Sequence, residues 1–139
     1  MKSSGAETIR RLVLDTSAYS RMTAGHGVVL DLIAAADIVL LPLIVLGELE
    51  AGFELGSRAR ENREMLEEFL VEPFVDTLAP TRTVARRYGE VFAALKKAGQ
   101  PIPTNDVWIA AATIDCGGHL LSFDQDFKRI RGLSCSVLS

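Results

Sequence analysis

The sequence contains few of the residues that build metal clusters or covalent cross-links. Its 139 residues include two cysteines, Cys116 and Cys135, and two histidines, His26 and His119. The cysteines do not have the spacing of a zinc site, and Cys116 lies in an apolar segment expected to be helical. We therefore expect no disulfide scaffold, and we expect the reducing environment of the cytoplasm.

Long apolar runs are also absent. The N-terminal stretch MKSSGAETIRR lacks the apolar core of a signal peptide. The longest apolar run, residues 37–50, is interrupted by Pro42 and is too short to span a bilayer. We expect no membrane segment, a flexible segment over residues 1–8, and a single domain over residues 9–139, a length that supports a real core.

An excess of positive charge is the third missing feature. The formal net charge is −3, from 15 basic and 18 acidic residues, which disfavours a protein that coats nucleic acid. It does not exclude a nuclease, because an acidic catalytic pocket lowers the total while a basic rim can still hold phosphates.

Short apolar runs alternate with helical patterns along the whole chain. Continuous runs such as Leu12–Leu14 are typical of strands that are buried on both faces of a parallel sheet. The predicted strands occupy residues 10–17, 38–42, 73–79, 119–124 and 133–138. The predicted helices occupy residues 27–37, 43–56, 57–72, 81–99 and 104–116, with Ser57 as N-cap of the third and a Gly117–Gly118 turn after the last. This order predicts a three-layer α/β/α sandwich around a mainly parallel sheet of four to five strands.

Five acidic residues lie where such a sheet places its ligand crevice, beyond the carboxyl ends of the strands. Asp15 ends the first strand, and Asp124 and Asp126 follow the fourth. Asp106 opens the helix before that strand, and Glu48 lies on the helix after the second strand. Only tertiary folding can bring these residues together.

Each acid also has a simpler explanation. Asp15 can cap a helix over TSAYSRM, and Asp106 can satisfy the free N–H groups at a helix start. Asp124 or Asp126 can cap a short turn. Glu48 and Glu50 point to nearly opposite faces of a helix, so one of them can simply be solvated. Independent caps, however, have no reason to gather at one edge of one sheet.

A gathered set of carboxylates has definite chemistry. The charges repel one another, and either some protonate or a cation neutralises them. Ligands that are all oxygen favour Mg²⁺ or Mn²⁺ over zinc. Such an ion binds phosphate oxygens and activates water, which is the chemistry of metal-dependent phosphodiester hydrolysis.

Four segments, VLDTSAY, GELEAG, PTNDVWIAA and LLSFDQDF, resemble in their order and spacing the PIN-domain ribonucleases, most closely the VapC-type toxins of toxin–antitoxin pairs. The resemblance extends from about residue 10 to residue 138. It implies an endoribonuclease that depends on Mg²⁺ or Mn²⁺ and cleaves structured RNA, such as transfer or ribosomal RNA. It also implies a homodimer and a cognate VapB-type antitoxin, which places a segment against the active site.

The resemblance also assigns roles to individual residues. The acidic quartet of the family corresponds to Asp15, Glu48, Asp106 and Asp124. The expected metal ligands are Asp15, Asp106 and Asp124, with Asp126 sharing or replacing the role of Asp124. Glu48 is expected to orient or deprotonate the attacking water, or to complete the metal shell. The expected supporting residues are Thr16, Ser17, Thr104 and Asn105, and Thr104 or Asn105 is also expected to cap the helix and leave Asp106 free.

RNA phosphates require basic residues around this pocket. The candidates are Arg21, Arg58, Arg60, Arg63, Arg82, Arg86, Arg87, Lys96, Lys97, Lys128 and Arg131. Any one of them can instead belong to a solvated helix face. Trp108 is expected in the core, while Tyr19 and Phe53 are expected either in the core or in a groove for the antitoxin.

Two other functions remain open. The chain can be a housekeeping nuclease that processes RNA, or a PIN-like binding module without catalysis. The retained acids argue against the second, and the lack of an added RNA-binding segment favours the toxin over the first.

Overall fold

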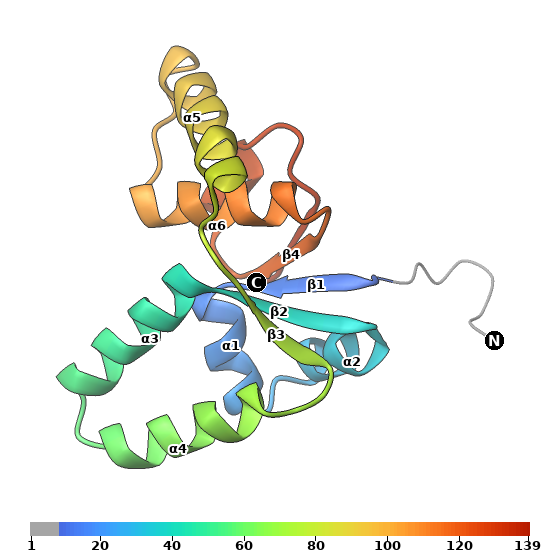
Figure 1. Ribbon diagram of the computed structural model, residues 1–139, viewed down its shortest axis with the longest axis vertical. Coiled ribbons are helices and arrows are strands. Elements are labelled where there is room, and N and C mark those ends of the chain that lie inside the picture. The colour runs from blue at the N-terminus through green and yellow to red at the C-terminus, as the bar shows by residue number, and fades with distance from the viewer. Residues whose placement is uncertain (1–8) are drawn as a thin grey trace.

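Five short strands form one sheet in which every neighbouring pair is parallel. The computed structural model describes residues 9–139, so the predicted flexible segment, residues 1–8, lies outside the described residues. The strands are β1 (Arg11–Leu14), β2 (Ile38–Pro42), β3 (Val75–Leu78), β4 (His119–Ser122) and β5 (Cys135–Val137). Their order is β3-β2-β1-β4-β5, which places β1 at the centre (Figure 1).

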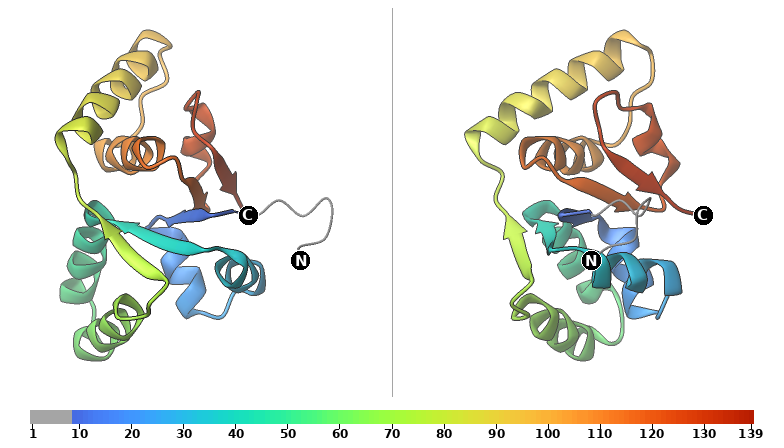
Figure 2. Two further views of the ribbon diagram at one scale, coloured as in Figure 1. Left: turned by 45° about the vertical axis from the view of Figure 1, so that its right-hand side comes forward. Right: turned by 90° about the vertical axis from the view of Figure 1, so that its right-hand side faces the viewer.

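Helices cover both faces of the sheet (Figures 1 and 2). On one side lie α1 (Thr16–Thr23), α2 (Gly27–Ala35), α3 (Leu43–Leu55) and α4 (Ala59–Leu70). On the other side lie α5 (Arg82–Lys97), α6 (Thr104–Asp115) and the short 3-10 helix η1 (Gln125–Arg129). This arrangement confirms the predicted three-layer sandwich with a parallel sheet of five strands.

The two central strands form the middle of the core. Leu12, Val13 and Leu14 of β1 and Leu120 and Leu121 of β4 have no exposed surface. Full burial of one such side chain contributes roughly 1.5–3 kcal/mol to stability. Because β1 and β4 are paired directly, this core holds the residues that follow both strands at the same edge of the sheet.

Two helix caps differ from the prediction. Ser57 does not cap α4, which begins at Ala59 after Arg58 and has no side-chain cap. Neither Thr104 nor Asn105 caps α6, because the residue before the helix is Pro103 and no side chain accepts a bond from the first turn. Proline fixes the backbone angle at a helix start, so α6 begins without a polar cap.

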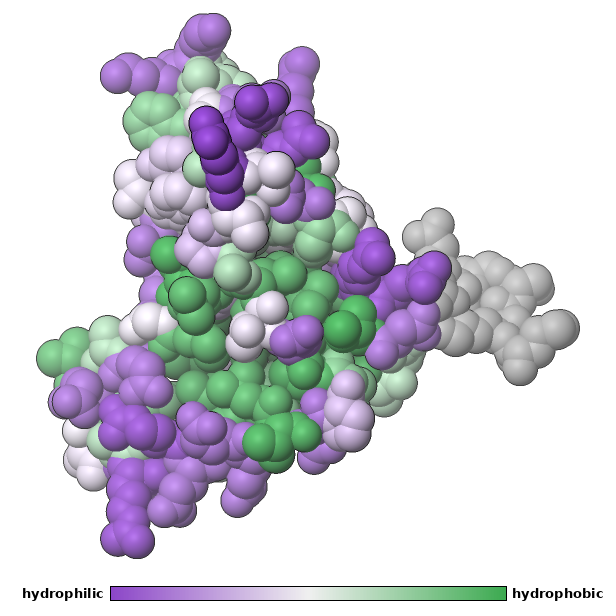
Figure 3. Space-filling model, viewed as in Figure 1, coloured by the Kyte–Doolittle hydropathy of each residue, from purple (hydrophilic) through white to green (hydrophobic). Residues whose placement is uncertain are grey.

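The surface around β3 is largely apolar, although the exposed residues of β3 itself, Asp76 and Thr77, are polar. Figure 3 shows apolar side chains gathered on this face, over β3 and the neighbouring helices. The exposed apolar residues of these elements include Leu43, at the start of α3, and Phe74, which precedes β3. Among the helices of residues 9–139, none combines the length and the apolar character needed to cross a membrane.

Candidate active site

Asp15 is a buried carboxylate, with an exposed fraction of 5%, between the end of β1 and the start of α1. It caps α1, because its Oδ1 accepts a hydrogen bond of 2.8 Å from the Ala18 backbone N–H. The Ser17 hydroxyl donates to the same oxygen at 2.7 Å, and the Ser122 hydroxyl donates to Oδ2 at 2.5 Å. Asp15 therefore caps α1 and also belongs to the acidic site.

Ser122 is a residue of the site that the sequence analysis did not identify. It ends β4, is fully buried, and joins two of the acidic segments. Its hydroxyl donates to Asp15 and accepts a bond of 2.9 Å from the Asp124 backbone N–H. The signal in the sequence was a single polar residue at the end of an apolar strand, two positions before Asp124.

Glu48 faces this edge of the sheet from α3. The Thr16 hydroxyl donates to its Oε1 at 2.6 Å, and the Asn105 side-chain amide donates to its Oε2 at 3.3 Å. Glu50, two residues later, instead accepts a bond of 2.8 Å from Arg63 of α4. The two glutamates therefore serve different faces of α3, as the helical spacing predicted.

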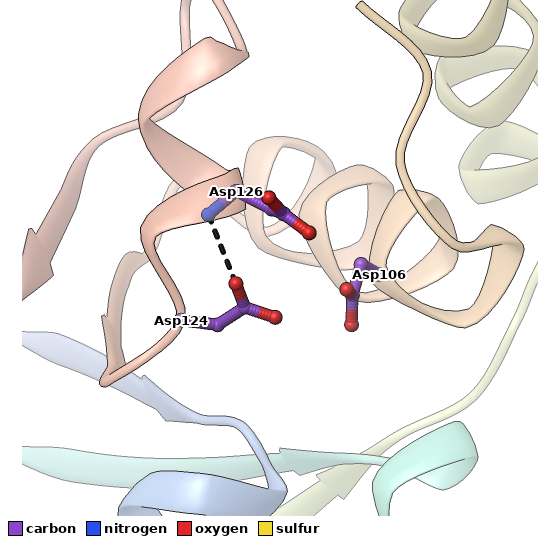
Figure 4. A group of neighbouring side chains, drawn as sticks. All are labelled: Asp106, Asp124 and Asp126. Carbon is purple, nitrogen blue, oxygen red and sulfur yellow. Dashed lines mark hydrogen bonds between the residues drawn. The ribbon is translucent and has the colours of Figure 1, made fainter.

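Three further carboxylates meet beside these groups. Asp106 projects from the first turn of α6, Asp124 precedes η1, and Asp126 lies in the first turn of η1. One carboxylate oxygen from each lies within 4.8 Å of the other two. Figure 4 shows the three side chains pointing toward one another, with Asp124 accepting a bond of 2.9 Å from the Asp126 backbone N–H.

Among the acids of the site, Asp106 has the most strongly raised pKa. Partial burial, followed by the charges of Asp124, Glu48, Asp15 and Asp126, raises the pKa of Asp106 from 3.8 to about 7. The charges of the other four predicted acids therefore act on Asp106 in the folded protein, although the five come from four separate segments.

Asp15 is also shifted, for a different main reason. Burial raises the pKa of Asp15 above its ordinary value, against the bonds from Ser122, Ala18 and Ser17, which lower it. The charge of Asp124 raises it further.

The ligand set fits a hard divalent cation. The group of Asp106, Asp124 and Asp126 offers carboxylate oxygens alone, with no histidine or cysteine. Its oxygens are close enough to share one ion, and a cation would relieve the repulsion that raises the pKa of Asp106. The oxygens of Asp15 and Glu48 are not part of this close group, because hydrogen bonds hold them to Ser17, Ser122, Thr16 and Asn105.

The predicted supporting residues divide into two kinds. Thr16, Ser17 and Asn105 contact the acids directly. The side chain of Thr104 is exposed and makes no hydrogen bond within residues 9–139.

Several of the basic residues proposed to surround the pocket form ion pairs with glutamates of the protein. Arg60 pairs with Glu64, and Arg87 pairs with Glu90. Arg63 joins α4 to Glu50 and Glu54 of α3. Arg129, which the sequence analysis did not select, lies 3.6 Å from Asp126 and donates to the Pro101 carbonyl.

The aromatic candidates pack within the protein, with Trp108 half-buried and the other two buried. Trp108 stacks on Tyr88 between α6 and α5, with ring centroids 4.2 Å apart, as expected for a packing residue. Tyr19 and Phe53 are buried, and Tyr19 packs edge-on against Phe69. The structure therefore places both of these residues in the core.

Comparison with known proteins finds one matching family and a similar ribonuclease. The family described as PIN domain matches residues 12–133. Ribonuclease VapC1 of Haemophilus influenzae is 33% identical over 98 residues, which are 70% of this chain and 72% of the relative.

Solved structures share the fold. VapBC2 from Rickettsia felis, bound to a DNA fragment from its promoter, aligns with a TM-score of 0.81 at 24% identity, over 93% of this chain and 99% of that chain. VapBC-1 from nontypeable Haemophilus influenzae has a TM-score of 0.79 at 22% identity, over 91% and 97%. VapC20 from Mycobacterium tuberculosis, described as a toxin that cleaves the sarcin-ricin loop, has a TM-score of 0.65 at 18% identity, over 84% and 92%.

Proposed function

The chain belongs to the PIN-domain family and, within it, to the VapC-type ribonucleases, and from this premise we propose that it is an endoribonuclease toxin that depends on Mg²⁺ or Mn²⁺. The observation that carries the proposal is the meeting of Asp106, Asp124 and Asp126 within 4.8 Å. Nearby carboxylates disfavour the charged form of one another, and a bound cation favours it.

The metal ligands in this proposal are Asp106 and Asp124, with Asp126 completing the group. Asp15 is a further ligand, directly or through water, because its charge acts on Asp106. When bound, the ion lowers the pKa of a coordinated water and binds a phosphate oxygen of the substrate.

The remaining residues position these groups. Glu48 is the proposed group that orients or deprotonates the attacking water, because Thr16 and Asn105 fix its carboxylate at the same edge of the sheet. Ser122 and Ser17 hold Asp15 in one orientation. Such a fixed arrangement reduces the reorganisation needed during the reaction.

The proposed substrate is structured RNA, as the description of VapC20 suggests for that protein. The proposed partner is a VapB-type antitoxin, since related structures such as VapBC-1 are named as toxin–antitoxin pairs. An antitoxin arginine inserted among the carboxylates would replace the metal charge. A homodimer is the proposed assembly, and the cytoplasm is the proposed location.

Cleavage of RNA by the purified protein tests the proposal. We expect cleavage with Mg²⁺ or Mn²⁺, none with EDTA, and a loss of at least about a hundredfold in Asp15→Asn and Asp106→Asn. Asp115→Asn is the matched control, because Asp115 lies at the far end of α6 and its side chain accepts a hydrogen bond from exposed Thr83. Full activity of Asp106→Asn, or restoration of activity by calcium alone, would contradict the proposed metal site.

Brief induction in a bacterium without the antitoxin tests the biological role. We expect growth arrest and a small set of new RNA 5′ ends with the wild-type chain and with Asp115→Asn, but not with Asp106→Asn. Cleavage in vitro without any growth defect would favour a housekeeping nuclease. Normal growth with no cleavage in either setting would favour a binding module.

A further inference from the structure

A cationic and aromatic cluster lies beside the acidic site. The guanidinium carbon of Arg21, in α1, is 4.4 Å from the centroid of the Phe123 ring. The imidazole of His26 contacts the same ring edge-on, with centroids 5.2 Å apart and planes at 75°. His26 is itself held at the start of α2, where its Nδ1 accepts from the Val29 N–H at 3.4 Å. We refer to Arg21 and Phe123 as the platform.

Hydrogen bonds connect the platform to the acids. Phe123 lies between Ser122, which bonds to Asp15, and Asp124 of the carboxylate group. Its backbone N–H donates to the Ser17 hydroxyl at 3.0 Å, and Ser17 in turn donates to Asp15. Arg21 follows Ser17 by one turn of α1, so both elements of the platform are fixed relative to the acidic site.

The guanidinium of Arg21 contacts the Phe123 ring but no carboxylate of the described residues. Within residues 9–139, its guanidinium makes no ion pair, whereas Arg60, Arg63 and Arg87 each pair with a glutamate. The Arg21 guanidinium lies over the Phe123 ring, and no hydrogen bond from its N–H groups is found within residues 9–139. Arg21 is also exposed, so an anionic ligand can reach it.

The acidic site creates a specific need for such a cation. The carboxylates repel the phosphates of an approaching RNA, and a bound metal offsets this repulsion only at the scissile phosphate. The nucleotide next to it requires a separate positive group. A guanidinium on an aromatic ring supplies both a phosphate contact and a flat surface for a base.

We propose that Arg21 and Phe123 form the subsite for the nucleotide next to the scissile phosphate. Arg21 binds its phosphate, and the platform stacks against its base or ribose. This inference rests on the proposed ribonuclease function. Stacking of this kind does not distinguish base edges, so the subsite contributes affinity and register along the RNA rather than base identity.

Binding of a short single-stranded RNA to the Asp106→Asn protein tests the subsite without cleavage. The probe is a fluorescent RNA whose anisotropy is measured at several salt concentrations. We expect Arg21→Ala to weaken binding about tenfold and to lower the dependence of log Kd on log salt by about 0.7, the value for one lost phosphate contact. Arg21→Lys should restore the salt dependence, because it restores the charge.

Substitution of Phe123 should affect RNA binding differently from substitution of Arg21. Phe123→Leu keeps an apolar side chain but removes the π face, so we expect binding to weaken about fivefold with unchanged salt dependence. Arg10→Ala is the matched control, since Arg10 was not a candidate for RNA binding, precedes β1 at the opposite edge of the sheet and pairs with exposed Asp37. It should leave RNA binding unchanged. In the wild-type background, Arg21→Ala should leave the affinity for Mn²⁺ unchanged.

Three results would overturn the subsite. The first is RNA binding by Arg21→Ala with the affinity and salt dependence of its parent. The second is equal weakening by Arg10→Ala, which would indicate a diffuse charge effect. The third is RNA binding by Phe123→Leu with the affinity of its parent, which would leave the ring without a role in the subsite. Failure of the ribonuclease proposal has a different signature, because the wild-type protein would then cleave no RNA with either metal.

Discussion

At the scale of single residues, Asp106 is where the charges of four other acids meet. The sequence alone gave Asp106 two explanations, a helix start and a metal ligand. In the structure it does not cap α6, and its pKa is raised to about 7 by burial and by the surrounding carboxylates. The folded protein therefore holds an unfavourable charge at this position whenever the pH is high and no cation is bound.

The stability of the metal-free protein should reflect this charge. A carboxyl with a raised pKa stabilises the folded state in acid, and this contribution is lost as the pH rises through the folded value. For Asp106 the loss runs from about pH 3.8 to about pH 7. After allowance for solvent screening, Asp106→Asn should raise the free energy of unfolding at pH 8 by roughly 1–2 kcal/mol, with little change at pH 4.

Urea unfolding in EDTA at both pH values measures this effect. Asp115→Asn is again the control, because Asp115 is an exposed acid on the same helix, and it should change stability by less than about 0.5 kcal/mol. An Asp106→Asn protein that is no more stable than wild type at pH 8 would argue against the crowding of charge at the site.

At the scale of elements, the connection between α6 and β4 fixes two acidic segments relative to each other. Asp106 is at the start of α6, and Asp124 follows β4. The predicted Gly117–Gly118 turn joins them, and Gly117 has a φ of +66°. Gly118 lies against β1, where an added Cβ would be 2.9 Å from Val13 Cγ2 and 3.2 Å from the Arg11 carbonyl oxygen.

Gly118→Ala should therefore destabilise the protein by roughly 1–3 kcal/mol, because the Arg11 backbone cannot move aside without shifting β1. Gly89→Ala in α5 is the matched control, since a Cβ there would meet nothing within 4 Å. Alanine is the better helix former, so Gly89→Ala should stabilise the protein by up to about 1 kcal/mol. Thermal unfolding of both variants checks the prediction, and equal stability of the two would refute the close packing at Gly118.

At the scale of the whole molecule, the acidic site brings together residues that lie far apart in the sequence. Asp15 follows the first strand, and Asp106 and Asp124 come from the last third of the sequence. The unfolded chain does not hold these groups together, so a cation binds the folded state far more tightly than the unfolded state. Metal binding and global stability should therefore be linked.

Addition of Mn²⁺ at ten times its Kd should raise the free energy of unfolding by about 1.4 kcal/mol. Chemical unfolding with and without Mn²⁺ measures the shift, and EDTA should reverse it. Asp106→Asn should lose most of the shift, whereas Asp115→Asn should keep it. A shift of equal size in Asp106→Asn would mean that the ion binds elsewhere.

The sequence by itself determined the layers of the fold and the approximate places of the acids. The apolar run Leu12–Leu14 identified a buried strand, and alternation of such runs with helical patterns identified a parallel sheet. These signals are local, because burial on both faces affects each strand residue by residue. The prediction that Asp15, Asp106 and Asp124 share one edge followed from a general property of parallel sheets.

Only the tertiary structure decided how the side chains meet. It grouped Asp126 with Asp106 and Asp124, showed that α6 starts without a polar cap, and brought Ser122 onto Asp15. It also placed Arg21 on Phe123 and paired Arg63 with Glu50. The reason is physical: each of these contacts joins residues from different elements, and their separation depends on how helices pack on the sheet.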